Sequence, residues 1–179
     1  MQISTMELNR LNFYRACELH GGLVLGQLVR RSRDADLILM LTRHAADELT
    51  HAQLWTETIV ALGGQLQPVE STYQARLGRI VGAPGSLFQV VALSHVIERR
   101  VLRHFTEHAR LPETHPIVRA ALERTIEEEK EHLSCMSDWL QLEAERRCVN
   151  VRDVLNRFAL ADARVYGELI NEYGFRTAA

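Results

Sequence analysis

Lysine and long apolar runs are nearly missing from this chain, and each absence argues against a class of partner. Lys130 is the only lysine among 21 basic residues, and 23 acidic residues bring the net charge to -2. The chain therefore has no basic field that would attract nucleic acid or an anionic membrane surface. No stretch reaches the roughly 20 consecutive apolar residues of a membrane span. We expect neither nucleic acid nor a membrane as a partner.

Cysteine is also scarce, and the sequence opens without a visible targeting signal. The three cysteines, Cys17, Cys135 and Cys148, form no C-x-x-C pair and are odd in number. That pattern fits a reducing compartment and argues against a disulfide framework. Residues 1–10 mix polar and apolar side chains and lack the apolar core of a signal peptide. We expect a cytoplasmic protein.

Glycine and proline are sparse outside residues 63–85, and no run of residues alternates as a strand would. Elsewhere the apolar residues recur with the helical period, which predicts an all-α protein. Ser86, Pro116 and Asn150 are typical of helix starts, and Gly63 is typical of a helix end. The pattern predicts five helices, at about 4–33, about 34–62, from 87, from 116 and about 150–173.

The lengths of the connections predict how these helices pack. Short links join the first helix to the second and the third to the fourth, so each pair forms an antiparallel hairpin. The segment between the hairpins, residues 63–85, is long enough to cross the length of a bundle. We therefore predict a single domain, residues 1–179, with an antiparallel four-helix core at about 4–146, this crossover, and an extra C-terminal helix.

Two short motifs match each other along the chain. Glu48 stands three residues before His51, and Glu129 stands three residues before His132. On a helix, positions i and i+3 share a face and can ligate one metal ion together. Either motif alone is weak evidence, because chance supplies about one such pair at this content of Glu and His.

A lone glutamate before each motif makes the pattern specific. Glu18 lies 30 residues before Glu48, and Glu98 lies 31 residues before Glu129. Each predicted hairpin therefore carries a Glu on its first helix and Glu-x-x-His on its second. Helical bundles hold two iron or manganese ions with this arrangement. The predicted metal ligands are Glu18, Glu48, His51, Glu98, Glu129 and His132.

The cost of burying these acids supports the same interpretation. Four carboxylates within about 5 Å of one another repel by about 3 kcal/mol per pair at an effective dielectric near 20. Such a core requires protons or cations, and two divalent ions would balance the four charges. Oxygen and nitrogen ligands without thiolate suit iron or manganese better than structural zinc. We expect two iron ions, with manganese or a mixed pair as the alternative.

In order and spacing, this pattern resembles the ferritin-like di-iron carboxylate superfamily, which includes rubrerythrins and tRNA-modifying di-iron hydroxylases. The resemblance covers roughly residues 7–142 and leaves the last helix outside. It implies that Glu48 and Glu129 bridge the two ions and that each histidine binds one. It also implies terminal or bridging roles for Glu18 and Glu98.

The acids directly before the two motif glutamates are Asp47 and Glu128. In relatives, the residue at this place often accepts a hydrogen bond from the opposite histidine, and such partners fix the imidazole tautomer. Asp47 and Glu128 are therefore either orienting residues for the histidines or simply exposed acids.

Three further residues lie one turn before a predicted ligand. His95 stands where rubrerythrin-like peroxidases are expected to carry another Glu. It is an additional nitrogen ligand, a partner of a ligand, or a core histidine unrelated to metal. Tyr14 and His44 could each donate to a bound oxygen species, although a packed aromatic is the better explanation for Tyr14.

Gly21 and Gly22 interrupt the first helix one turn after Glu18. Each costs about 1 kcal/mol relative to alanine inside a helix, so a reason for keeping them is expected. They either leave room for substrate or oxygen beside the metals, or allow the helix at about 150–173 to approach closely.

These features predict an oxidoreductase whose metal pair activates O2 or peroxide, with an unknown substrate that could be a small organic molecule. The chain would then need an external reductase or a two-electron substrate. The first alternative is a ferroxidase or iron-handling protein of the ferritin type, and the second is a non-catalytic helical bundle. We expect a monomer or a small homo-oligomer.

Overall fold

The computed structural model describes residues 3–82 and 84–175, which form helices and no strand. The all-α prediction is therefore confirmed for these residues. The helix starts predicted at Ser86, Pro116 and Asn150 are confirmed. Ser86 accepts from the backbone N–H of Gln89, and Pro116 lies in the first turn of its helix. The helices are α1 (Thr5–Val29), α2 (Ala35–Ala61), α3 (Tyr73–Val81), α4 (Leu87–Arg110), α5 (Pro116–Arg146) and α6 (Val151–Tyr173).

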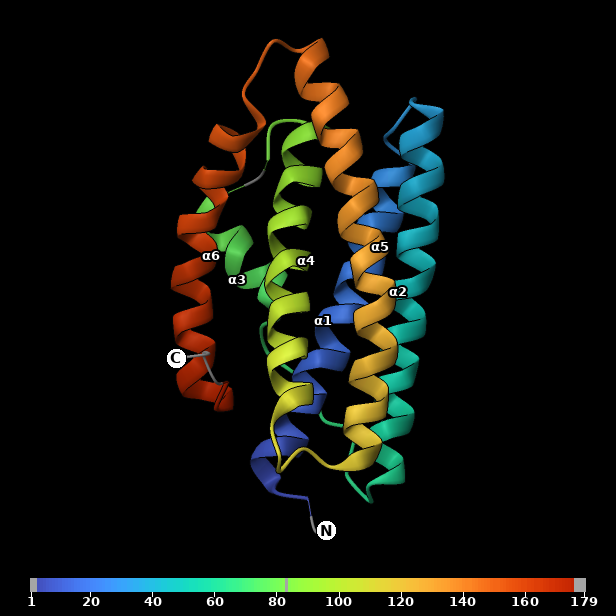
Figure 1. Cartoon of the computed structure of the whole chain (residues 1–179), viewed down its shortest axis with the longest axis vertical. Helices are drawn as coiled ribbons and strands as arrows, with labels where there is room; N and C mark the ends of the chain where they lie inside the picture. The colour runs from blue at the N-terminus through green and yellow to red at the C-terminus, as the bar shows by residue number, and fades with distance from the viewer. Residues whose placement is uncertain (1–2, 83, 176–179) are drawn as a thin grey trace.

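The long helices form two antiparallel hairpins that lie side by side (Figure 1). α1 packs along α2, α4 packs along α5, and α2 and α5 join the two hairpins. The chain leaves the lower end of α2 in Figure 1 and enters α4 at the upper end. Residues 63–85 therefore cross the length of the bundle, as predicted.

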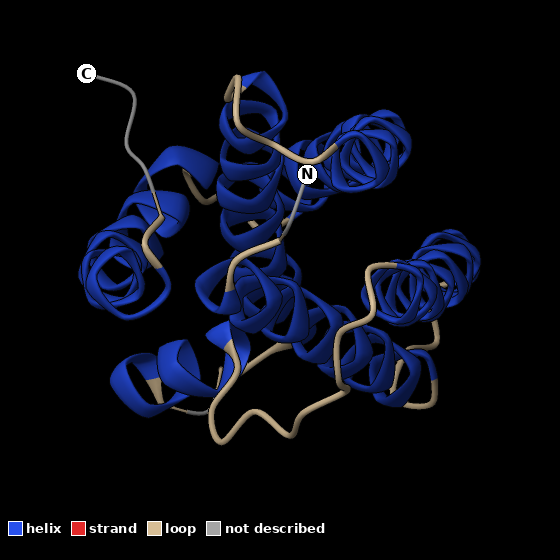
Figure 2. Cartoon of the chain, turned by 90° about the horizontal axis from the view of Figure 1, so that it is seen from below, coloured by secondary structure: helices blue, strands red, loops and turns tan. Residues whose placement is uncertain are grey.

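The crossover differs from the prediction because it contains a sixth helix, α3. Thr72 caps this helix by accepting from the backbone N–H of Ala75, and Tyr73 and Leu77 are buried. The helix was not predicted because glycine is unfavourable in helices and is frequent in this segment. α3 packs against α6, so the crossover and the last helix cover the same flank (Figure 2).

The C-terminal helix α6 packs mainly against α4, with α3 beside it. Its buried residues include Val154, Val165 and Leu169. The apolar stripe of α6 is therefore covered by its own chain. None of the helices described has the length and hydropathy needed to span a bilayer.

Two apolar clusters divide the core. One contains Leu11, Trp55 and Leu122, and the other contains Leu41 and Met136. On α1, α2 and α5, the predicted metal ligands fall in the sequence between residues of the two clusters. The polar site therefore lies where the two clusters meet, far from both ends of the bundle.

Candidate metal centre

Four helices bring the six predicted ligands into the interior. His51 and Glu129 are fully buried, and the other four side chains are at most 7% exposed. Ligand atoms of five of these residues, together with His44, form two groups, and within each group all atoms lie within 4.8 Å of one another. Glu48 and Glu129 belong to both groups. Glu18 and His51 complete the first group, and His44 and His132 complete the second. These buried groups could hold a metal ion.

The two motif histidines turn the same ring nitrogen inward. His51 Nδ1 lies 3.3 Å from Glu129 Oε1 and 3.6 Å from Glu18 Oε2. His132 Nδ1 lies 3.1 Å from Glu129 Oε2, one helical turn away. Because i and i+3 share a helix face, each Glu-x-x-His pair presents an oxygen and a nitrogen to the same point.

The outward nitrogens of these histidines meet carboxylates on the facing helix. His51 Nε2 lies 2.6 Å from Glu128 Oε2, and His132 Nε2 lies 3.1 Å from Asp47 Oδ2. Both acids are only partly buried. A carboxylate at Nε2 favours the proton there and leaves the inward Nδ1 lone pair free for a cation. Asp47 and Glu128 thus lie at the positions where the sequence analysis expected acids that orient the histidines.

His44 lies closer to the site than the sequence indicated. Its Nε2 atom is 3.2 Å from Glu48 Oε1 and 3.5 Å from Glu98 Oε1. Its ring stacks on that of His132, with 3.9 Å between centroids. His44 therefore occupies a ligand place in the second group. Glu98, predicted as a ligand, is in neither group and meets the site through His44.

Gly21 and Gly22 of α1 allow α2 to pack closely against this helix. Neither of the two explanations considered from the sequence included this role. A Cβ added at Gly21 would collide with the Glu48 carboxylate. One added at Gly22 would press on Leu49 and on the carbonyl oxygen of Ala45. Gly21 therefore provides the space that the Glu48 carboxylate occupies, and Gly22 brings the helices together.

His95 and Tyr14 do not join the two groups. His95 is partly buried, and its Nδ1 atom has no hydrogen-bond partner among the described residues. Burial and the nearby Arg99 cation lower its pKa, so it is neutral near pH 7. The Tyr14 hydroxyl turns away from Glu18, toward His104 and His108 on α4. No pattern along the chain marked either of these histidines as a contact of Tyr14.

Burial and mutual repulsion set the protonation of the carboxylates. Burial first, and then the neighbouring acids, raise the pKa of Glu48 well above its usual range and that of Glu98 to about 7. Burial also raises the pKa of Glu18. For Glu129, burial acts in the same direction, but the close imidazoles of His132 and His51 outweigh it and lower the pKa.

For the histidines, burial and the neighbouring carboxylates shift the pKa in opposite directions. Burial lowers the pKa of His51, but the nearby carboxylates of Glu129 and Glu18 more than compensate and raise it to about 12. The pKa values of His44 and His132 are raised as well, since neighbouring carboxylates outweigh their burial. Without metal, the site therefore binds protons at places that cations could take over.

Buried polar atoms without a hydrogen-bond partner indicate whether a metal ion fits this site. His51 Nδ1, Glu129 Oε1 and His44 Nδ1 are buried without a hydrogen-bond partner. An unpaired buried polar atom costs about 1–3 kcal/mol. Two of these atoms, His51 Nδ1 and Glu129 Oε1, face each other across 3.3 Å. A cation coordinated by both would satisfy them, so this oxygen and nitrogen donor set fits a transition metal.

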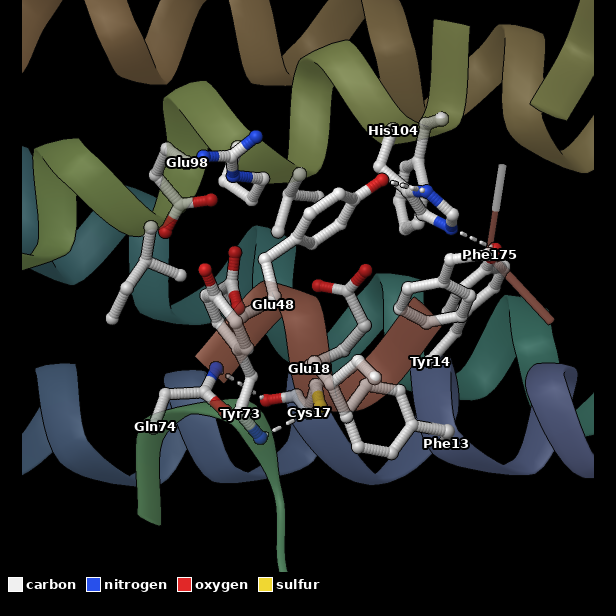
Figure 3. Close-up of a pocket in the computed structure, with 16 residues that line it drawn as sticks. Phe13, Tyr14, Cys17, Glu18, Glu48, Tyr73, Gln74, Glu98, His104 and Phe175 are labelled. Carbon is white, nitrogen blue, oxygen red and sulfur yellow. Dashed lines mark hydrogen bonds between the residues drawn. The ribbon is translucent and has the colours of Figure 1, made fainter. Parts of the chain in front are cut away.

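A cavity of about 40 Å³ borders the site on the side of α1, α4 and α6. Glu18, Glu48 and Glu98 form its polar wall, and aromatic side chains such as Phe13 and Phe175 form much of the rest (Figure 3). Its volume has room for about three water-sized molecules. On the opposite side, an open groove lined by residues of α2 and α5 reaches His44 and His132.

In comparisons with protein-family models, curated proteins and solved structures, nothing matched the chain. The functional argument therefore rests on the geometry and chemistry of this site.

Proposed function

We propose that the chain is a ferritin-like di-metal oxidoreductase that binds two iron ions and activates O2 or peroxide. The observation that carries the proposal is the sharing of two buried carboxylates, Glu48 and Glu129, by two adjacent ligand groups. A carboxylate has two oxygens and can bridge two ions. The antiparallel hairpins and the long crossover support the ferritin-like assignment.

The geometry divides the remaining ligands between two positions. Glu18 and His51 complete the first position with three carboxylates and one imidazole. His132 and His44 complete the second, with Glu98 beside His44. The second position is richer in nitrogen, and this asymmetry is compatible with iron, manganese or a mixed pair.

The cavity supports a reaction with a small oxidant. Three carboxylates of the site border it, so a molecule of the size of O2 or hydrogen peroxide would lie directly against them. The aromatic side chains make the rest of the cavity wall mainly apolar. Two reduced iron ions would supply the electrons for the reduction, and a separate reductase or a two-electron substrate would restore them.

Metal content tests the proposal directly. After anaerobic reconstitution with ferrous iron, elemental analysis should find about two ions per chain. Glu129→Ala should lose both, because its carboxylate serves both positions, whereas Glu18→Ala should keep about one. Glu123→Ala, an exposed acid on the same helix, is the matched control and should keep both. Full occupancy in Glu129→Ala, or less than about 0.3 ion per chain in the unaltered protein, would contradict the proposal.

A further inference from the structure

We propose that Glu7, His108, Tyr14, His104 and Tyr166 form a proton-delivery path from the molecular surface to the cavity beside the metal site. The proposal rests on the function proposed above, because reduction of an oxidant in the cavity consumes protons. None of these residues belongs to the two ligand groups.

The path is a continuous series of side-chain contacts. Glu7 Oε1 lies 2.8 Å from His108 Nε2, and His108 Nδ1 lies 3.1 Å from the Tyr14 hydroxyl. That hydroxyl lies 2.5 Å from His104 Nε2, and His104 Nδ1 lies 3.0 Å from the Tyr166 hydroxyl. Tyr14, His104 and Tyr166 line the cavity, and Figure 3 shows the two hydrogen bonds of His104.

The hydrogens along the path can all point the same way. When a solvent proton reaches Glu7, its carboxyl group donates to His108 Nε2, and the His108 Nδ1–H donates to the Tyr14 oxygen. The Tyr14 O–H then donates to His104 Nε2, which leaves His104 Nδ1–H to donate to the Tyr166 oxygen. The Tyr166 O–H remains free to donate into the cavity. Every member of the chain between the ends both accepts and donates, as proton transfer requires.

The electrostatic setting keeps the middle of the path neutral. Burial, with His108, Arg10 and Arg100 adding cationic charge nearby, holds the pKa of His104 well below its usual range. Burial likewise raises the pKa of Tyr14 well above its usual range. Neither group stores a charge near pH 7. A proton therefore crosses by successive shifts along the hydrogen bonds.

Glu7 is arranged as the surface end of the path. Ser4 and Glu7 have the spacing of a capping box, in which the glutamate side chain would return to the Ser4 backbone. Only half of that motif forms, because Ser4 accepts from the Glu7 N–H while the Glu7 carboxylate binds His108 and Arg10. Glu7 and His108 both line a surface groove with Ile3. The Glu7 side chain is 16% exposed, so solvent reaches part of it, while the Oε1 atom that faces His108 is buried.

The stoichiometry defines what the path must carry. Reduction of one hydrogen peroxide to two waters takes two electrons and two protons. The electrons come from two ferrous ions, which become ferric, and the protons come from the cavity. For each proton that Tyr166 gives to the cavity, one shifts along each hydrogen bond and one enters at Glu7 from solvent. Each transfer leaves the hydrogens pointing the opposite way, so the hydroxyl groups must rotate and His104 and His108 must return to their starting tautomers before the next proton crosses.

The first test needs no metal and therefore stands apart from the proposed function. In the full-length metal-free protein, NMR measures solvent exchange of the His104 Nδ1 proton. A conducting path gives exchange that Tyr14→Phe slows about tenfold or more, because the only hydroxyl between the two histidines is lost. If the Tyr14 hydrogen bond is only structural, Tyr14→Phe instead speeds the exchange, because weakened packing opens the site more often. Equal or faster exchange in Tyr14→Phe overturns the proposal.

The second test asks whether the metal site uses the path. In iron-loaded protein, peroxide-driven oxidation should slow about tenfold or more in Tyr14→Phe and Glu7→Gln, with a larger solvent deuterium effect. Iron content should stay unchanged. Tyr173→Phe, which removes a hydroxyl outside the cavity wall, is the matched control. Unchanged oxidation rates in both variants at full iron content overturn the proposal, whereas loss of iron binding in the unaltered protein overturns the proposed function instead.

Discussion

Gly21 and the carboxylate of Glu48 occupy one small volume between α1 and α2. We expect Gly21→Ala to weaken metal binding by about tenfold or more, because the added methyl group displaces a proposed bridging ligand. The fold should survive, since alanine favours the helix by about 1 kcal/mol. Metal competition against a chelator and urea denaturation measure the two effects separately.

Gly26→Ala is the control for this change. Its added Cβ would meet nothing within 4 Å, so it should gain the same helix propensity and keep full metal affinity. Equal metal affinities in the two variants would show that Glu48 does not need the space at Gly21.

Residue types and spacings predicted much of the site, but not which side chain reaches it. Glu18, Glu48, His51, Glu129 and His132 were found because helical spacing places them on buried faces. His44 had the same spacing signal and was interpreted only as a possible donor to bound oxygen. The choice between His44 and Glu98 depends on distances between α2 and α4, which no spacing within one helix specifies.

At the scale of elements, one buried acid joins the crossover and the last helix to the bundle. Asp162 on α6 is 3% exposed, accepts from the Tyr73 hydroxyl of α3 and pairs with Arg100 of α4. Arg100 in turn lies over the Tyr166 ring, 4.4 Å from its centroid. The three helices therefore meet at a single carboxylate.

We expect Asp162→Ala to lower the free energy of unfolding by about 3–5 kcal/mol, because it leaves a partly buried cation and a phenol without their partner. Urea denaturation measures this loss. Glu168→Ala removes an exposed acid from the same helix and should change stability by less than about 0.5 kcal/mol. Similar stability for the two variants would mean that α6 is held by its apolar contacts alone.

The pH dependence of stability is a property of the whole metal-free molecule. The folded-state pKa of His51 is raised to about 12 from an ordinary value of 6.5. Above pH 7 the unfolded chain has lost this proton and the folded chain keeps it, so stability falls as pH rises. The loss is at most about 1.4 kcal/mol per pH unit for each such group. Raised pKa values of His44 and His132 act in the same direction.

Denaturation of metal-free protein between about pH 7 and 8.5 checks this sign. His51→Gln should flatten the slope. His95→Gln should leave it unchanged, because the lowered pKa of His95 makes it neutral in both states over this range. Bound metal should also flatten the slope, since ions replace the protons. Stability that rises with pH in metal-free protein would contradict the electrostatics described for the site.

Particle size separates an oxidase from an iron store. A store needs a large shell, and shells need extended apolar contacts between chains. Here α6 covers its apolar stripe with its own chain, and the exposed large apolar residues are scattered over every helix except α4. We expect a particle of at most about four chains that oxidises about two ferrous ions per chain and then stops until reduced.

Light scattering after size-exclusion chromatography, followed by stepwise iron addition under oxygen, measures both quantities. A particle of about twelve chains or more that continues to consume iron would make a ferroxidase or storage protein the better assignment.

Patterns along the chain were enough to predict the helical class, the two hairpins, the crossover and the main acids and histidines of the site. Each of these follows from local causes, namely helical period, capping residues and spacing along one helix. The helix within the crossover, the ligand place of His44 and the contacts of Tyr14 with His104 and His108 were decided only by tertiary structure. These features depend on distances between residues remote in sequence, which packing sets and which no pattern along the chain encodes.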